Sequence, residues 1–414
     1  MTRAIITFIA IILVLEVYSQ SCLPNGIVFS SQEQIDNFQS DYPECSHIEG
    51  YLNIGVYAVE NDITNLNGLN SITQVDGDIQ IFSTSNLISL SGLDNLSTVQ
   101  GSIHLGVSEA GVGNFLLADL SGLNGLTYIG NSLEISHNTF LTSLLGLESL
   151  NYIGGALSIN NNSNLTDISA LENISNIGES LAIYDNFSLV DLSGLDNIAS
   201  INGNLYLSSN ANLNTLTNLS NLVAINGNLK IYFNGSLTDL NGLNNLTSID
   251  GDIQISINNV LVSLDGINNI DPNTIQSLTI NNNSSLTECH IQSVCDYLDI
   301  PEALVDIRDN VIGCNNQEEV ELACETIGIY QLQPEGVNHY PNPSHNKIVF
   351  DIPPPSEKTY LIISDIYGKS IKQIKIYPQQ KQVIWNCQNQ AAGIYFYQTE
   401  IFGVIYQGKI VIQP

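Results

Sequence analysis

Histidine and acidic side chains are the first candidates for chemistry, and neither kind forms a catalytic pattern in this sequence. The chain has six histidines, and only His104 and His137 lie well inside its repeated region. Neither has a Ser, Cys or acidic residue at a spacing that suggests a triad. A Gly-rich phosphate loop, a His-Glu-x-x-His sequence and a paired metal motif are also lacking. The sequence therefore predicts a protein that is not an enzyme and that has no cofactor or metal.

Two aspartates are candidates for such chemistry. Asp167 and Asp191 occupy equivalent places in neighbouring repeats, just before the apolar Ile168 and Leu192. Asp commonly accepts hydrogen bonds from turn backbone, so turn capping is the favoured role, and a calcium ion between the carboxylates is a second hypothesis. Glycan-cleaving β-solenoids use carboxylates on neighbouring coils. A secreted glycan-active hydrolase with an unrecognised site is therefore the alternative function.

Aromatic side chains offer a binding chemistry instead. On the outward positions of three successive strands the sequence places Tyr184, Tyr206, Lys230 and Tyr232. At about 4.8 Å per coil they would form a platform roughly 10 Å across. Tyrosine rings suit stacking on sugars or anchoring a protein partner, although the strand preference of tyrosine explains them equally well. These four residues are the candidate ligand-binding set, for a glycan or protein that the sequence does not name.

The elements that would position these residues come from a repeat. Gly-Leu pairs or their equivalents begin at residues 68, 92, 122, 146, 170, 194, 218, 242 and 266. All steps but one are 24 residues, and the exception of 30 residues contains a six-residue extension within Gly106 to Asn114. Insertions in solenoids project from one face and often serve function. This inserted loop is the second place to look for a ligand.

Each repeat is mostly strand and turn. In one unit the apolar positions Leu147, Leu150, Ile153, Leu157 and Ile159 recur at offsets that the other units share. Alternation through Leu157 and Ile159 indicates a short strand with one buried face, and no window in the repeats sustains a helical period. We expect an all-β fold, a parallel β-solenoid of about ten coils followed by a small antiparallel β-sandwich.

A recurring asparagine follows the second strand of most units. Stacked side-chain amides at a turn can bond the backbone of their own coil and of the next. We expect these residues to hold the turn rather than to bind a ligand. The ladder consists of Asn138, Asn162, Asn186, Asn210, Asn234, Asn258 and Asn283, with Thr84 in an earlier unit.

Cysteines mark both ends of the repeats. Cys22 and Cys45 flank the start, while Cys289, Cys295, Cys314 and Cys324 follow the end. In an exported protein we expect Cys22 to bond Cys45 and the last four to form two bridges. Four cysteines permit three connectivities, of which first to third and second to fourth is the favoured one. Their spacing lacks the paired knuckles of a zinc site. Cys387 is the thiol left over.

A capping helix is expected before the repeats. Ser31 with Gln34 forms a capping-box pattern, and Ile35 and Phe38 would lie on one face of a short helix. Its apolar face would cover the first coil.

Charge divides the chain into two parts. Residues 21–325 hold 35 acidic residues against Lys230 and Arg308, a net charge of 2 − 35 = −33, and residues 326–414 hold seven lysines against five acids, a net charge of +2. A surface with this much negative charge repels the phosphate backbone of nucleic acids and the headgroups of anionic lipids. Binding of nucleic acid is therefore excluded from the expected functions.

The first residues have the pattern of a secretory signal peptide. Arg3 precedes a mostly apolar run from Ala4 to Leu15 and a small-residue site that ends at Ser19. A lipoprotein anchored through Cys22 is the rival interpretation, but a lipobox Leu is lacking and lipidation would leave Cys45 without its nearest partner.

Part of the repeat resembles a known family. The segment from Cys45 to Ile54 is similar to the opening of a receptor L domain, and the later Leu-x-x-Ile-x-Gly-x-Leu-x-Ile units fit the same leucine-rich pattern. The resemblance implies a right-handed solenoid, from about Cys22 to Cys324, whose outer face binds a ligand. No catalytic residue carries over.

The last ninety residues resemble the type A sorting domain of type IX secretion cargo. Four motifs in order carry the resemblance, and their residues include Tyr340, Pro341, Asn342, Pro343, Gly368, Gly393, Tyr395 and Lys409. It implies a secreted or surface-attached protein, recognised by outer-membrane secretion machinery and cleaved by a sortase-like peptidase.

The expected organisation has five parts. They are a signal peptide over residues 1–19, an N-terminal cap over 20–48, the repeat solenoid over 49–288, a cysteine-rich cap over 289–325 and the sorting domain over 326–414. The expected function is that of an exported, noncatalytic binding or adhesion protein.

Overall fold

A computed structural model describes residues 20–57, 59–108, 110–331, 337–402 and 404–413. The predicted signal peptide, residues 1–19, lies outside these ranges. The chain divides into two compact units, Met1–Cys324 and Glu325–Pro414, and each is described by itself. Within the described ranges, the structure contains no helix with the length and apolar character needed to cross a membrane.

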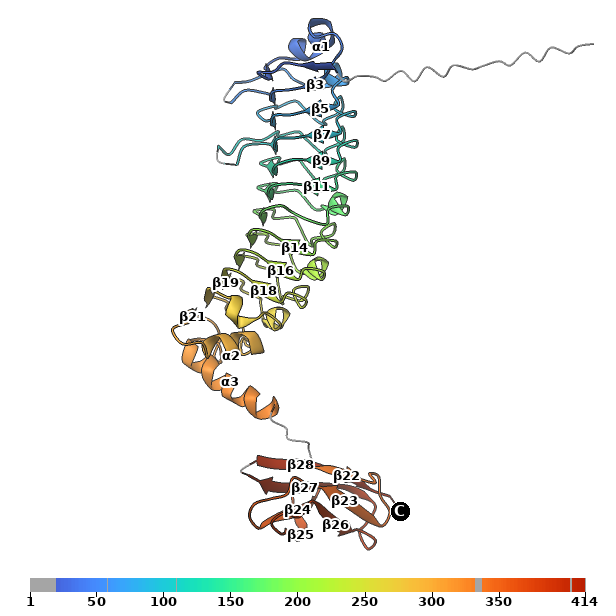
Figure 1. Cartoon of the computed structure of the whole chain (residues 1–414), viewed down its shortest axis with the longest axis vertical. Helices are drawn as coiled ribbons and strands as arrows, with labels where there is room; N and C mark the ends of the chain where they lie inside the picture. Colours follow the sequence, from blue (N-terminus) through green and yellow to red (C-terminus); the bar gives the residue numbers. More distant parts are fainter. Residues whose placement is uncertain (1–19, 58, 109, 332–336, 403, 414) are drawn as a thin grey trace, which may run out of the picture. The chain divides into compact units, whose positions relative to one another are not determined.

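One long parallel sheet runs through the first unit (Figure 1). Each coil contributes one strand, and the ten coils between the caps are extended by one strand from each cap. In sheet order the strands are β2 (Ile27–Phe29), β4 (Leu52–Ile54), β6 (Ile79–Ile81), β8 (Ile103–Leu105), β10 (Leu133–Ser136), β12 (Leu157–Asn160), β13 (Leu181–Tyr184), β15 (Leu205–Ser208), β17 (Leu229–Tyr232), β19 (Asp252–Ser256), β20 (Ser277–Asn281) and β21 (Leu304–Arg308).

Two shorter parallel sheets line another side of the same coils. The first contains β1 (Gln20–Cys22), β3 (Cys45–Ile48), β5 (Gln74–Val75), β7 (Thr98–Val99), β9 (Tyr128–Ile129) and β11 (Tyr152–Ile153), and the second contains β14 (Ser200–Ile201), β16 (Ala224–Ile225) and β18 (Ser248–Ile249). Single bridges through Ile177 connect them. Short 3-10 turns occur at Asn67–Leu69, Ser169–Leu171, Thr217–Leu219, Asp265–Ile267 and Pro272–Thr274.

The solenoid core consists of stacked aliphatic side chains. Leu157 pairs with Leu181 and Ile159 with Ile183 on adjacent strands, and all four are fully buried. Because the same residue types occupy the same offset in each coil, every coil covers the apolar face of the next. The inward positions predicted from the repeat are confirmed.

A buried asparagine ladder holds the turn after the long sheet. Asn162 donates from Nδ2 to the carbonyls of Ile135 and Asn160 (2.9 and 3.0 Å), and its Oδ1 accepts the backbone N–H of Asn138 (3.0 Å). The predicted ladder is confirmed, with two additional members. Asn114 and Asn310 make the same kinds of bond, so the inserted loop ends before Asn114, which the sequence analysis had included in it.

The N-terminal cap contains helix α1 (Gln32–Asp41). Ser31 and Gln34 form the predicted capping box, and Ile35 and Phe38 are its buried residues. A disulfide joins Cys22 to Cys45. The apolar face of α1 thus covers the first coil, as expected from the sequence.

The cap at the other end of the solenoid contains helices that the sequence analysis did not predict. Helix α2 (Gln292–Leu298) precedes β21, and helix α3 (Gln317–Gln331) follows it. Disulfides join Cys289 to Cys314 and Cys295 to Cys324, the favoured connectivity. Helix α3 continues beyond residue 325, where we had expected the cap to end.

The second unit is an antiparallel β-sandwich. One sheet contains β22 (Asn338–Tyr340), β23 (Lys347–Asp351) and β26 (Gln382–Asn386), and the other contains β25 (Ser370–Ile376), β24 (Thr359–Asp365), β27 (Gly393–Ile401) and β28 (Val404–Ile412). Side chains from both sheets share one core around Phe350, Trp385 and Ile363. Cys387 is a buried free thiol.

Candidate binding face of the solenoid

Three tyrosines from successive coils meet on the outward face of the long sheet. Leu181 and Ile183 point inward, so Tyr184 faces outward at the end of β13. Tyr206 and Tyr232 follow from the same alternation in β15 and β17. The ring centroids of Tyr184 and Tyr206 are 5.5 Å apart, and those of Tyr206 and Tyr232 are 5.2 Å apart. The structure thus brings together the three tyrosines proposed from the sequence, hereafter the tyrosine cluster.

The rings of the tyrosine cluster are packed edge to face. Their planes meet at 87° and 89°, a favourable arrangement for aromatic quadrupoles. The Tyr232 hydroxyl donates a hydrogen bond to the Tyr206 hydroxyl. Burial, helped by this hydrogen bond, raises the pKa of Tyr232. Tyr232 therefore keeps its proton at physiological pH, and the cluster presents ring edges and hydroxyl groups rather than one flat aromatic surface.

Lys230 lies beside the tyrosine cluster. It is paired in register with Tyr206 on one side and with Gln254 on the other. The salt bridges among the described residues do not involve Lys230. Its ammonium group is therefore available to a carboxylate or hydroxyl of a ligand.

The inserted loop folds back along this face. It leaves the solenoid after β8 and closes through a bridge between Val107 and Val112. The Ser108 hydroxyl lies 3.1 Å from Asn160 Oδ1 and 3.2 Å from the Tyr184 hydroxyl. Sequence reasoning kept the loop and the tyrosines as separate candidates. Ser108 and Tyr184 are 76 residues apart in the sequence, so no local sequence pattern predicts their contact.

A histidine–glutamate pair supports the base of the loop. His104 Nδ1 lies 3.0 Å from Glu134 Oε2, and the Ser108 backbone N–H donates to Glu134 Oε1 (3.2 Å). The hydrogen bond from His104 holds the pKa of Glu134 below its usual value, and the Ser108 N–H contributes in the same direction against the opposing effect of burial. Glu134 therefore ties the inserted loop to the sheet as a carboxylate.

Phe233 extends the tyrosine cluster from a strained position. Its ring centroid is 5.8 Å from that of Tyr232, its side chain is 50% exposed and its φ is +58°. The equivalent residue in most coils also has positive φ and is small or polar, as at Ser83, Asn161, Asp185 and Ser209. A bulky side chain is a genuine outlier in this backbone region. Phe233 was not predicted as a site residue, although Phe233 and Ile257 are the two large apolar residues in this row of positive-φ positions.

The paired aspartates cap turns. Asp167 Oδ1 accepts the backbone N–H of Ser169 (2.8 Å), and Asp191 Oδ1 accepts that of Ser193 (3.0 Å). These bonds agree with turn capping, the role that the sequence favoured for both aspartates. Across the described ranges, no three His, Cys, Asp or Glu side chains are grouped so that they could hold a metal ion.

In the second unit, Asn342 ties the Tyr340 to Ser344 motif to the last strand. Its Nδ2 donates to the Lys409 carbonyl (3.0 Å), and its Oδ1 accepts the backbone N–H of Val411 (2.8 Å). The Ser344 N–H donates to the Val411 carbonyl (2.9 Å), and both Pro341 and Pro343 follow cis peptide bonds. Two motifs at opposite ends of the domain sequence are therefore joined by the Asn342 side chain and the Ser344 backbone.

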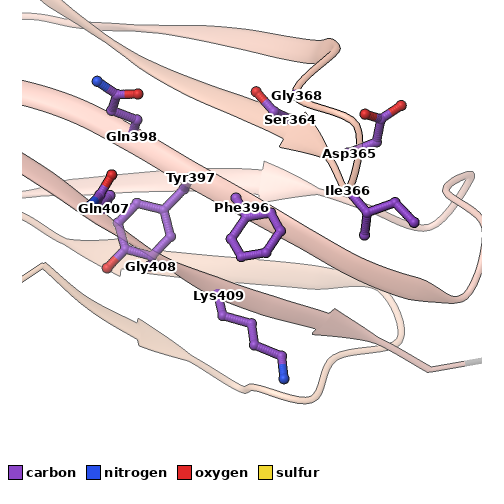
Figure 2. Close-up of a pocket in the computed structure, with 10 residues that line it drawn as sticks. All are labelled: Ser364, Asp365, Ile366, Gly368, Phe396, Tyr397, Gln398, Gln407, Gly408 and Lys409. Atoms are coloured by element: carbon purple, nitrogen blue, oxygen red, sulfur yellow. The ribbon is translucent and has the colours of Figure 1, made fainter.

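The remaining motif residues lie at turns and around a pocket. Asp365 Oδ1 accepts the N–H groups of Tyr367 and Lys369 (2.9 and 3.0 Å), which closes the turn at Gly368. The Tyr395 hydroxyl donates to the Ala391 carbonyl (2.7 Å), and Gly393 begins β27. Gly368, Phe396 and Lys409 line a pocket of about 680 Å³, and Figure 2 shows the residues that surround it.

Comparison with known proteins agrees with both units. Residues 44–110 match the family model described as Receptor L domain, and residues 338–413 match the Secretion system C-terminal sorting domain. The chain carries a receptor L domain and a secretion sorting domain. A search of curated proteins finds no match.

The sorting domain indicates the cellular location of the protein. It identifies cargo of the type IX secretion system, which is exported and then secreted or attached to the cell surface. The same domain implies an interaction with that secretion machinery. The L domain match covers the coils of β4, β6 and β8, at the end of the solenoid that carries the inserted loop.

Proposed function

We propose that this protein is a noncatalytic binding or adhesion protein of the bacterial surface, and that the tyrosine cluster with Lys230 contacts its ligand. The observation that carries the proposal is the meeting of Tyr184, Tyr206 and Tyr232 on the outward face of an otherwise polar sheet. Tyrosine is one of the residues enriched at binding hot spots, and Lys230 adds a positive charge beside the three rings. The two matched domains are of non-enzymatic kinds.

A glycan or a protein is the ligand class that this surface supports. Exposed phenyl and phenol edges provide apolar contact area, and Lys230 provides a single positive charge on a solenoid with a net charge of −33. Such a charge selects the part of a partner that carries a carboxylate or a hydroxyl. Asp167 and Asp191 cap turns. This role gives no support to the alternative function of a glycan-active hydrolase.

The proposal is tested by an array of glycans and host proteins probed with the exported protein. Tyr206→Ala and Tyr232→Ala should each weaken the binding found on the array by about tenfold, the loss of one hot-spot contact. The melting temperature should hardly change, because both side chains lie outside the aliphatic core. Gln254→Ala, on the same outward row as Lys230, is the matched control and should bind normally.

The sorting domain supports a proposal about maturation. We infer that a sortase-like peptidase removes it after export and that the signal peptide is removed earlier, so that the solenoid is the mature part. We place the boundaries at residue 19 and at residue 325, the latter within helix α3, with caps over 20–48 and 289–325 around the repeats of 49–288. Intact-mass analysis of surface-released protein tests this, and a species ending at Pro414 would contradict it.

A further inference from the structure

A hollow lies on the outward face of the long sheet, between two loops. The segments after β4 and β8 leave the solenoid on the same side (Figure 1), and β6 lies between these two strands in the sheet. Each segment closes through an antiparallel bridge, Val56 with Val59 in one and Val107 with Val112 in the other. The two loops therefore stand on either side of the β6 coil and form a cleft above it, hereafter the loop cleft.

The bases of both loops depend on glycine. Gly55 has a φ of +92° and Gly106 a φ of +99°. A Cβ at either position would lie 1.9 Å from a backbone oxygen of the following coil, that of Phe82 or Ser136. Backbone can approach this closely only where a side chain is absent. A glycine packed against the next coil thus fixes the start of each loop, and with it the two sides of the cleft.

The loop cleft has the size and lining of a small-ligand site. Its volume is about 470 Å³, and its lining includes Tyr57, Gln80, Phe82, His104, Ser108 and Glu134. Small-ligand pockets usually span a few hundred to about 1,000 Å³ and combine apolar walls with a few polar groups. Tyr57 is 58% exposed and Phe82 is 9% exposed, so one ring stands at the rim and the other forms part of the floor.

The charges around the loop cleft select against ions. Glu134 already accepts hydrogen bonds from His104 and from the Ser108 N–H, so a cation would have to displace a partner. The solenoid has a net charge of −33 over residues 21–325, which repels an anion. A neutral ligand faces neither penalty.

The polar groups favour hydroxyl groups. Gln80 offers both an amide donor and a carbonyl acceptor, and Ser108 offers a hydroxyl. Tyr57 and Phe82 provide aromatic surface for C–H groups. A ring compound with several hydroxyls on an apolar body matches both sets of groups.

We propose that the loop cleft binds one neutral sugar residue, and that Gln80 is its main side-chain contact. None of the residues of the tyrosine cluster lines the cleft, although Ser108 of the cleft contacts the Tyr184 hydroxyl. The proposal does not require that the tyrosine cluster bind a ligand. It gives the surface protein a saccharide-specific contact at the end of the solenoid that carries the L domain match.

Saturation-transfer NMR on the full chain tests the proposal with methyl glycosides of glucose, galactose, mannose and N-acetylglucosamine at about 10 mM, a concentration that detects weak binding. At least one should bind, while glucuronate and glucosamine should bind at least tenfold more weakly. Gln80→Ala should weaken binding about tenfold, the effect of about one lost hydrogen bond. Gln254→Ala, an amide on the same row of the sheet outside the cleft, should leave binding unchanged, and so should Tyr206→Ala.

Three results would overturn the proposal. They are the absence of binding by every neutral glycoside, equal binding of the charged sugars, and unchanged affinity in Gln80→Ala. Loss of sugar binding in Tyr206→Ala with normal binding in Gln80→Ala would place the sugar on the tyrosine cluster, which contradicts the loop cleft site and supports the proposed function.

Discussion

The Ser108 hydroxyl lies 3.2 Å from the Tyr184 hydroxyl, although the two residues belong to coils three strands apart in the long sheet. The inserted loop and the tyrosine cluster are thereby parts of one surface. Since Ser108 also contacts Asn160, a single side chain fixes the loop to two further coils.

Ser108→Ala should loosen the inserted loop without unfolding the solenoid. Removing the hydroxyl deletes two contacts at a partly buried site, each worth about 1 kcal/mol. Hydrogen exchange at Val107 and Val112, which bond each other through their backbone, should accelerate several-fold. Ser89→Ala, whose hydroxyl contacts only Ser91 of its own turn, is the control. Unchanged exchange at both valines would show that Ser108 does not anchor the loop.

Phe233→Asn should stabilise the solenoid. A left-handed backbone costs an ordinary L-residue about 1–2 kcal/mol, and asparagine tolerates it better. We expect a gain of up to about 1 kcal/mol in the free energy of unfolding. The reverse change at the equivalent position, Asn161→Phe, should destabilise by a similar amount. Denaturant titration measures both, and a marked loss of stability in Phe233→Asn would contradict the strain argument.

Asn186→Ala should be among the most damaging single substitutions in the repeats. Asn186 is fully buried, donates to the Ile159 carbonyl (2.9 Å) and accepts from the Asn162 N–H (3.2 Å). Leaving two buried backbone groups without partners should cost about 3 kcal/mol. Asn197, in contrast, donates to the Glu172 carbonyl at an exposed site.

The matched substitution Asn197→Ala should therefore cost less than about 1 kcal/mol, because water replaces the lost partner. Denaturant titration of both variants compares them directly. Equal losses would mean that burial does not determine the contribution of the asparagine ladder.

The ladder also shows how far sequence reasoning reaches. A repeated offset revealed the inward residues, such as Leu157 and Ile159, and most of the buried asparagines, since identical coils must place identical residues in identical surroundings. The insertion broke the offset, and Asn114 was therefore counted as loop although it is fully buried in the ladder. Helices α2 and α3 were missed because each occurs once, where no neighbouring repeat reinforces the pattern.

The candidate site was predicted in part for a similar reason. Tyr184, Tyr206 and Tyr232 share outward offsets, so their proximity follows from the coil spacing. The contact of Ser108 with Tyr184 depends on how an irregular loop folds back, which periodicity does not describe. The cleft around Gln80 likewise requires two loops whose directions are set by Gly55 and Gly106.

Acidification should release the inserted loop through Glu134. The hydrogen bond from His104 lowers the pKa of Glu134 from its usual 4.5. A carboxylate with a lowered folded-state pKa contributes stability above pH 4.5 and loses it as the pH falls through the folded-state value. The stability difference between the wild type and Glu134→Gln should therefore shrink below pH 4.5.

His104→Gln provides the control for this pH dependence, because it removes the largest cause of the pKa shift. Its stability should fall less steeply with acid than that of the wild type. Melting curves between about pH 3 and pH 7 span the relevant range. A constant difference between the wild type and Glu134→Gln across this range would contradict the assignment.

Ligand affinity of the Tyr206→Ala/Tyr232→Ala double variant tests the central claim most directly. The exported protein and the variant are compared on the ligand that the array identifies, with circular dichroism to verify that the solenoid remains folded. We predict that the double variant binds at least tenfold more weakly, because it removes two of the three rings that meet on the sheet. Unaltered affinity in a folded double variant would contradict the account.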